Sequence, residues 1–117
     1  MLIIEDNSDV AETLATLVEL LGFDAAIAPD GPSGVEKAQV WEPAAILCDI
    51  GLPGISGYEV AKYLRSEARF HAVLMVAVSG YAQYADRQRA LEAGFDEHMS
   101  KPVDIDRLTA LLHANLA

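Results

Sequence analysis

The sequence is short of cysteine, of basic residues and of long apolar runs, and each shortage excludes a class of protein. Cys48 is the only cysteine, so we expect no disulfide framework but a buried, reduced thiol in a cytoplasmic protein. No apolar run approaches the roughly 20 residues that a membrane-spanning helix needs. Only 8 basic residues stand against 18 acidic ones, a formal net charge of −10. That balance argues against direct contact with nucleic acid or with an anionic membrane.

Short apolar segments alternate with amphipathic ones along all 117 residues, a length that suits one domain spanning 1–117. We predict strands over 2–4, 24–28, 45–48, 73–78 and 96–100. We predict helices over about 9–21, 30–41, 57–68, 83–93 and 105–116. This alternation favours parallel βαβ units, and strands that are apolar throughout indicate helices on both faces of the sheet. The predicted fold class is therefore α/β, with a doubly wound, five-stranded parallel sheet.

Helix-capping residues support these boundaries. Ser56 and Glu59 are spaced as a capping box for the third helix, and Asp104 can cap the last one. The run Asp6-Asn7-Ser8 can cap the first helix, and a cap formed by Asp6 itself would be a purely structural explanation for an acid at that position.

Polar residues stand where the predicted strands end. Glu5 and Asp6 follow the first strand, Asp49 the third, Ser79 the fourth and Lys101 the fifth. Because the carboxyl ends of parallel strands meet at one edge of a sheet, we expect these side chains to converge there. Two ionised carboxylates about 5 Å apart repel by roughly 3 kcal/mol at an effective dielectric of about 20, and Mg²⁺ would relieve that repulsion. The set fits phosphoryl transfer to an aspartate nucleophile.

Four motifs resemble those of the receiver domains of two-component response regulators, in the family's order and spacing. They are Glu5-Asp6-Asn7, the loop DIGLPGISG over 49–57, Val78-Ser79-Gly80-Tyr81-Ala82, and Lys101-Pro102 after Gly94-Phe95-Asp96. The resemblance covers essentially the whole chain and implies the flavodoxin-like strand order 2-1-3-4-5. The stretch DIGLPGISGYEVAKYLR is similar to receivers fused behind histidine kinases in hybrid sensors. Since Met1 lies almost inside the first strand, we expect a domain cut from a longer protein.

The resemblance also implies a role for each acid at the site. Asp49 corresponds to the phosphoacceptor, which takes a phosphoryl group from a phosphohistidine on a histidine kinase or a histidine phosphotransfer protein. Glu5, Asp6, Asp49 and the backbone carbonyl of Gly51 correspond to the ligands of Mg²⁺. Glu5 replaces the commoner Asp, and its extra methylene still reaches a cation.

Ser79 and Lys101 correspond to the residues that bind the phosphoryl oxygens, and the Lys101-Pro102 bond lies where the family has a cis peptide. His98 departs from the family, which usually has Tyr or Phe three residues before the lysine, a ring that swings inward when the hydroxyl residue moves. From the residues alone, we expect a partly exposed histidine without chemistry. A second hypothesis is that its titration, near an ordinary pKa of about 6.5, makes the output pH-sensitive.

Three functions remain open from the residues themselves. The first is a signalling domain in which phosphorylation switches a partner-binding surface. Such a domain is not an enzyme acting on other substrates and catalyses only its own phosphotransfer and autodephosphorylation. The second is an aspartyl-phosphate phosphohydrolase, which usually has an acid where this chain has Gly51. The third is a binding module that never accepts phosphate. Nucleotide binding is disfavoured, because no Gly-rich loop follows the first strand. We also expect Gly51 and Tyr81 to control how water reaches the phosphoryl group.

Overall fold

Five parallel strands form the centre of the molecule. In the computed structural model, which describes residues 1–80 and 84–116, they are β1 (Leu2–Ile4), β2 (Ala26–Ala28), β3 (Ala45–Asp49), β4 (Leu74–Ser79) and β5 (Glu97–Ser100). They make one sheet in the order β2-β1-β3-β4-β5, and every neighbouring pair is parallel. The predicted parallel sheet and its strand order are confirmed.

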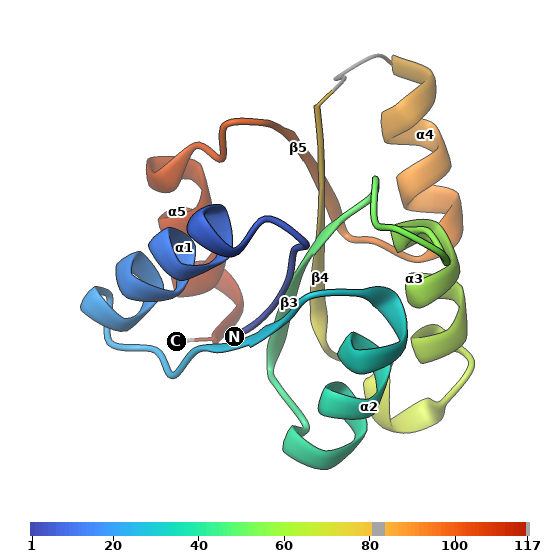
Figure 1. Ribbon diagram of the computed structural model, residues 1–117, viewed down its shortest axis with the longest axis horizontal. Helices are drawn as coiled ribbons and strands as arrows, with labels where there is room; N and C mark the ends of the chain where they lie inside the picture. The colour runs from blue at the N-terminus through green and yellow to red at the C-terminus, as the bar shows by residue number, and fades with distance from the viewer. Residues whose placement is uncertain (81–83, 117) are drawn as a thin grey trace.

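Helices cover both faces of this sheet (Figure 1). They are α1 (Ser8–Leu20), α2 (Gly31–Trp41), α3 (Gly57–Arg65), α4 (Tyr84–Ala93) and α5 (Ile105–Leu116), with a short 3₁₀ helix, η1 (Ala68–Phe70). α1 and α5 lie on one face, and α2, α3 and α4 lie on the other (Figure 1). The doubly wound arrangement is therefore confirmed. Within 1–80 and 84–116, none of the helices combines the length and the apolar character needed to cross a bilayer.

Two apolar layers, one on each side of the sheet, make up the core. Ile3 and Leu47 belong to the layer under α1 and α5, whereas Ile4 and Cys48 belong to the layer under α2, α3 and α4. Because side chains alternate along a strand, strands covered on both faces are apolar throughout. Cys48 is fully buried, as predicted, and burial raises the pKa of its thiol.

Side-chain caps fix where four of the described helices begin, and at α2 the cap is Asp30, whose carboxylate accepts from the Ser33 N–H at 2.8 Å. Ser56 caps α3, and the Asp104 carboxylate accepts a hydrogen bond from the Arg107 N–H at 3.1 Å, so both predicted caps are confirmed. At α1, the Asn7 side chain accepts from a backbone N–H of the first turn at 3.1 Å. The cap of α1 is therefore Asn7, and the structural explanation offered for Asp6 is wrong.

α3 ends three residues earlier than predicted, at Arg65 rather than Ala68. The Arg65 guanidinium donates to the carbonyl oxygens of Phe70 (2.7 Å) and Gly94 (2.8 Å), and it pairs with the Asp96 carboxylate at 2.9 Å. These contacts draw the chain after Arg65 into the tighter turn of η1. They also tie α3 to the segment between α4 and β5.

Candidate functional site

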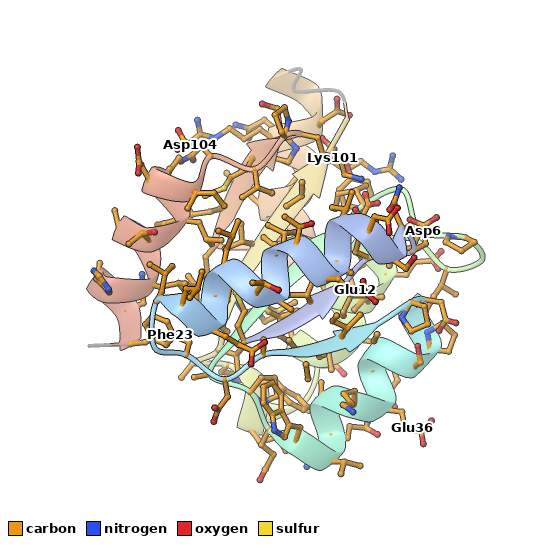
Figure 2. All side chains as sticks on the ribbon, turned by 60° about the vertical axis from the view of Figure 1, so that its left-hand side comes forward. Asp6, Glu12, Phe23, Glu36, Lys101 and Asp104 are labelled. Atoms are coloured by element: carbon orange, nitrogen blue, oxygen red, sulfur yellow. The ribbon has the colours of Figure 1, made fainter. Side chains whose placement is uncertain are left out.

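The predicted site residues meet at the carboxyl end of the sheet. Glu5 directly follows β1, Asp49 and Ser79 are the last residues of β3 and β4, and Lys101 directly follows β5. Figure 2 shows Asp6 and Lys101, which come from opposite ends of the sequence, at the same end of the sheet. The parallel strand order thus produces the convergence that the sequence predicted.

Asp49 is a buried carboxylate held by two donors. Its Oδ1 accepts the Gly51 N–H at 3.0 Å, and its Oδ2 accepts the Lys101 ammonium at 2.9 Å. β3 reaches Asp49, one residue beyond the prediction, because the ladder continues with a 2.9 Å bond from the Ile50 N–H to the Val78 carbonyl. The strand and the two donors together fix the position of the carboxylate, and only 7% of Asp49 is exposed.

The loop after Asp49 packs tightly against the first turn of α3. The Gly57 N–H donates to the Ile50 carbonyl at 3.1 Å. A Cβ at Gly57 would lie 2.6 Å from the Asp49 carbonyl oxygen and 2.8 Å from the Ile50 Cα. Only glycine fits this approach, so Gly57 lets α3 begin directly against the end of β3.

Lys101 joins the two buried carboxylates. Its ammonium lies 3.0 Å from Glu5 Oε1 and 2.9 Å from Asp49 Oδ2. Partial burial lowers the pKa of Lys101, but the bonds to Asp49 and Glu5 outweigh it and the pKa is raised. The Lys101-Pro102 peptide bond is cis, the form that the resemblance implies. The Lys101 N–H also donates to the Ser79 carbonyl at 2.8 Å, which anchors the segment to β4.

Glu5 and Asp49 differ in their affinity for a proton. Burial raises the pKa of Glu5 to about 7, with the neighbouring Asp49 and Asp6 acting in the same direction and Lys101 against it. Burial alone would raise the pKa of Asp49, but its bonds to Glu5, Lys101 and the Gly51 N–H lower it overall. Near neutral pH, Asp49 is therefore the ionised partner and Glu5 retains a proton part of the time.

The three acids offer a set of oxygens that suits a hard divalent cation. Carboxylate oxygens of Glu5, Asp6 and Asp49 all lie within 4.8 Å of one another. Mg²⁺ binds a few carboxylates and retains several waters, so it can bridge oxygens at this spacing. Burial first, and the neighbouring carboxylates second, raise the pKa of Glu5, and a bound cation would favour its ionised form. These residues therefore fit a Mg²⁺ site, whereas the predicted use of the Gly51 carbonyl stays a prediction.

Ser79 and His98 are in direct contact, which the sequence did not reveal. The Ser79 hydroxyl oxygen lies 2.8 Å from His98 Nε2, and only 7% of His98 is exposed. The expectation that His98 is partly exposed is therefore wrong, whereas the expectation that it has no chemical role stays a prediction. The register explains this, because β5 places His98 opposite Ala77, two residues before Ser79 on the same face of the sheet. Tyr81, expected to shield the site, lies outside the described residues.

The sequence resembles known proteins over nearly its whole length. It matches the family model of the response regulator receiver domain over residues 1–113. It is 33% identical over 114 residues to the cell cycle response regulator CtrA of Brucella ovis and to that of Brucella canis. Each alignment covers 97% of this chain and 48% of the relative. The chain thus spans about half the length of the curated relatives it matches.

Solved structures share the same architecture. One is the receiver domain of the sensor histidine kinase PA1611 from Pseudomonas aeruginosa, which has a magnesium ion coordinated in its active site cleft. It superposes on this chain with a TM-score of 0.87 at 27% identity, and the match covers 97% of this chain and 93% of that one. A CheY-like response regulator receiver domain protein from Methanospirillum hungatei gives 0.87 at 25%, covering 97% and 89%. The chemotaxis response regulator CheY4 of Vibrio cholerae gives 0.90 at 20%, covering 98% and 96%, which shows the fold alone.

Proposed function

The chain belongs to the response regulator receiver domain family, and from that premise we propose that Asp49 is its phosphoacceptor. A carboxylate oxygen of Asp49 attacks the phosphorus of a phosphohistidine on a histidine kinase or a histidine phosphotransfer protein. The new O–P bond forms as the P–N bond breaks, and the leaving imidazole nitrogen keeps the electron pair and takes a proton from water. The observation that carries this proposal is the buried, ionised Asp49 carboxylate, held by Lys101 at 2.9 Å beside the acids of β1.

Mg²⁺ is the proposed cofactor. Glu5, Asp6, Asp49 and the backbone carbonyl of Gly51 would hold it, and the bound ion would offset the negative charge of the carboxylates and the phosphoryl oxygens. The proposal is supported by the carboxylate oxygens within 4.8 Å of one another and by the magnesium ion described for the PA1611 receiver.

Lys101 and Ser79 are the proposed phosphoryl-binding residues. The Lys101 ammonium already touches the acceptor carboxylate, so it can turn to phosphoryl oxygens that form there without moving its backbone. Ser79 ends the neighbouring strand and brings a hydroxyl to the same edge. Phosphorylation would replace one carboxylate charge by about −2 and supply three strong acceptor oxygens, which shifts the equilibrium between two conformations of the domain.

An apolar groove beside Asp49 supports a protein as phosphodonor. The groove has a volume of about 580 Å³ and lies between α1 and the segment after β5. Val10 and Leu14 line one wall, and Val103 and Ile105 line the other. A kinase or phosphotransfer protein in the cytoplasm could bury apolar side chains there while its phosphohistidine faces Asp49.

We favour a signalling domain over a phosphohydrolase. The residue two positions after Asp49 is Gly51, whose contribution to the site is a backbone N–H rather than an acid. The chain then lacks, at that position, the general acid that an aspartyl-phosphate phosphohydrolase would use on other substrates. Its proposed chemistry is limited to its own phosphorylation and dephosphorylation.

Incubation with acetyl phosphate and Mg²⁺ tests the proposal. Mass spectrometry of the intact protein should show one added phosphoryl group, stable to acid and labile to base, as expected for an acyl phosphate. Asp49→Asn should abolish it, whereas Asp24→Asn, the same chemical change just before β2, should leave it unchanged. An unmodified wild type would favour a binding-only module, and modification that persists in Asp49→Asn would contradict the assignment.

A further inference from the structure

His98 is a buried titratable side chain that the proposed phosphotransfer leaves without a role. Its Nε2 lies 2.8 Å from the hydroxyl oxygen of Ser79. Both residues belong to adjacent parallel strands, β5 and β4, whose register pairs His98 with Ala77. Ala77 packs into the apolar layer under α2, α3 and α4. The contact between His98 and Ser79 is thus set by the backbone of the sheet on that face.

A single hydrogen lies between these two atoms, and its position decides what Ser79 can do. A serine hydroxyl has one hydrogen and two lone pairs, whereas a neutral imidazole has one N–H and one bare nitrogen. With a bare Nε2, the Ser79 hydroxyl donates to His98. With a hydrogen on Nε2, His98 donates, and the Ser79 hydrogen can point to a different acceptor.

A phosphoryl group on Asp49 would present only acceptors to Ser79. Its three terminal oxygens carry no hydrogen when the group is fully ionised. Ser79 can therefore bind it only by donating its single hydrogen. A bare His98 Nε2 competes for that hydrogen. An Nε2–H instead donates to a lone pair of the Ser79 oxygen, which leaves the hydroxyl hydrogen for the phosphoryl group and strengthens that second hydrogen bond.

Burial, more than the surrounding charges, keeps the His98 ring neutral near pH 7. Burial lowers its pKa below the ordinary value of 6.5, Asp86 raises it, and Arg107 and Arg87 lower it further. Asp86 and Arg87 belong to α4, and Arg107 of α5 is paired with Glu97 at 3.0 Å. The position of the hydrogen is then a choice between two tautomers of a neutral ring.

We propose that His98 is a positioning residue for Ser79, donating its Nε2–H to the Ser79 oxygen and directing the Ser79 hydrogen to the phosphoryl group on Asp49. This inference rests on the proposed phosphorylation of Asp49. Phosphorylation selects the Nε2–H tautomer, in which Nδ1 has released its hydrogen to water and Nε2 has gained one. A phenyl ring at this position would fill the same space without supplying a donor.

The tautomer can be read directly in the wild-type protein. Long-range ¹H–¹⁵N spectra distinguish a bare ring nitrogen from an N–H nitrogen, and they can be recorded with Mg²⁺ alone and during turnover of acetyl phosphate. The phosphorylated protein should show the hydrogen of His98 on Nε2. A bare Nε2 in the phosphorylated protein would overturn the proposal. Because this measurement uses the wild-type protein, it does not depend on whether a variant folds.

Substitutions test whether the donor matters. His98→Gln places an N–H donor at the same number of bonds from Cβ as Nε2, whereas His98→Leu fills space without one. His98→Leu should slow phosphorylation by acetyl phosphate about tenfold, the scale of a lost hydrogen bond in a charged network, and His98→Gln should restore most of the rate. Equal rates for the two variants would contradict the donor role.

A Ser79→Ala background separates positioning from packing. If His98 acts through Ser79, neither His98→Leu nor His98→Gln should slow the reaction further in that background. An undiminished effect of His98→Leu there would show a packing role and overturn the inference. Failure of wild type to be phosphorylated would overturn the proposed function itself, whereas normal phosphorylation unaffected by any His98 substitution overturns only the role of His98.

Discussion

Lys101 contacts two buried carboxylates, those of Glu5 and Asp49, with one ammonium group. Substituting Lys101 therefore tests whether this residue only helps to bind the phosphoryl group that Asp49 is proposed to accept. Lys101→Ala should slow phosphorylation of Asp49 without abolishing it, because Lys101 assists and does not accept. It should also lower the free energy of unfolding by about 1–3 kcal/mol, since Glu5 and Asp49 lose charged hydrogen bonds. Urea unfolding measures the second effect. The exposed Lys62→Ala on α3 is the control and should stay within about 0.5 kcal/mol; a Lys101→Ala value as small as this would contradict the account.

Glu5 should make the metal-free protein less stable as the pH rises. Its pKa is 4.5 ordinarily and about 7 in the folded state, so the folded form binds the proton more tightly than the unfolded form. The resulting stability is full below about pH 4.5 and is lost as the pH rises to about 7. The lowered pKa of His98 acts in the opposite sense, losing stability as the pH falls below its ordinary 6.5.

Comparison with Glu5→Gln isolates this effect, because His98 is present in both proteins. Unfolding free energies measured in chelator between pH 4.5 and pH 7 should fall more steeply with rising pH in wild type than in Glu5→Gln. Parallel curves would mean that Glu5 does not retain its proton in the folded protein.

At the scale of elements, the start of α3 depends on the close approach of Gly57 to the end of β3. Gly57→Ala puts a Cβ 2.6 Å from the Asp49 carbonyl oxygen, so either the start of α3 or Asp49 has to shift. The expected loss is about 1–3 kcal/mol of unfolding free energy, together with slower phosphorylation. Gly51→Ala is a matched control in the same loop, because its Cβ would have an ordinary 3.7 Å contact with Asp49 Oδ1. Equal losses in thermal or urea unfolding would contradict the steric explanation.

The elements themselves were largely predictable from the sequence. Apolar runs located all five strands, and the caps at Ser56 and Asp104 located two of the helix starts. The end of α3 was not predictable, because Arg65 is held by partners 29 and 31 residues away in sequence, Gly94 and Asp96. Local propensity contains no information about such contacts.

The same distinction applies to the site. Glu5, Asp49 and Lys101 were predictable because each lies at a strand end, and parallel strands bring those ends together whatever their register. The contact between Ser79 and His98 was missed because it depends on register, with His98 opposite Ala77. A one-residue shift of β5 would have turned His98 to the other face.

At the scale of the whole molecule, one ion would join segments that are far apart in the sequence. Glu5 and Asp6 follow β1 and Asp49 ends β3, so a cation held by all three stabilises the folded chain and not the unfolded one. Mg²⁺ at about 100 times its Kd should add about 2.7 kcal/mol to the free energy of unfolding. Thermal melts with Mg²⁺ and with chelator measure this, and Asp49→Ala should lose most of the shift. An equal shift in Asp49→Ala would place the ion elsewhere.

The central proposal is that Asp49, and no other aspartate of the chain, accepts the phosphoryl group. Borohydride reduces an acyl phosphate to the alcohol, so an aspartyl phosphate becomes homoserine that survives digestion and can be sequenced by mass spectrometry. After treatment with acetyl phosphate, Mg²⁺ and borohydride, the peptide that contains Asp49 should carry homoserine at that position, and samples without phosphodonor should carry none. Homoserine at Asp6 or at any other aspartate, with Asp49 unmodified, would contradict the account.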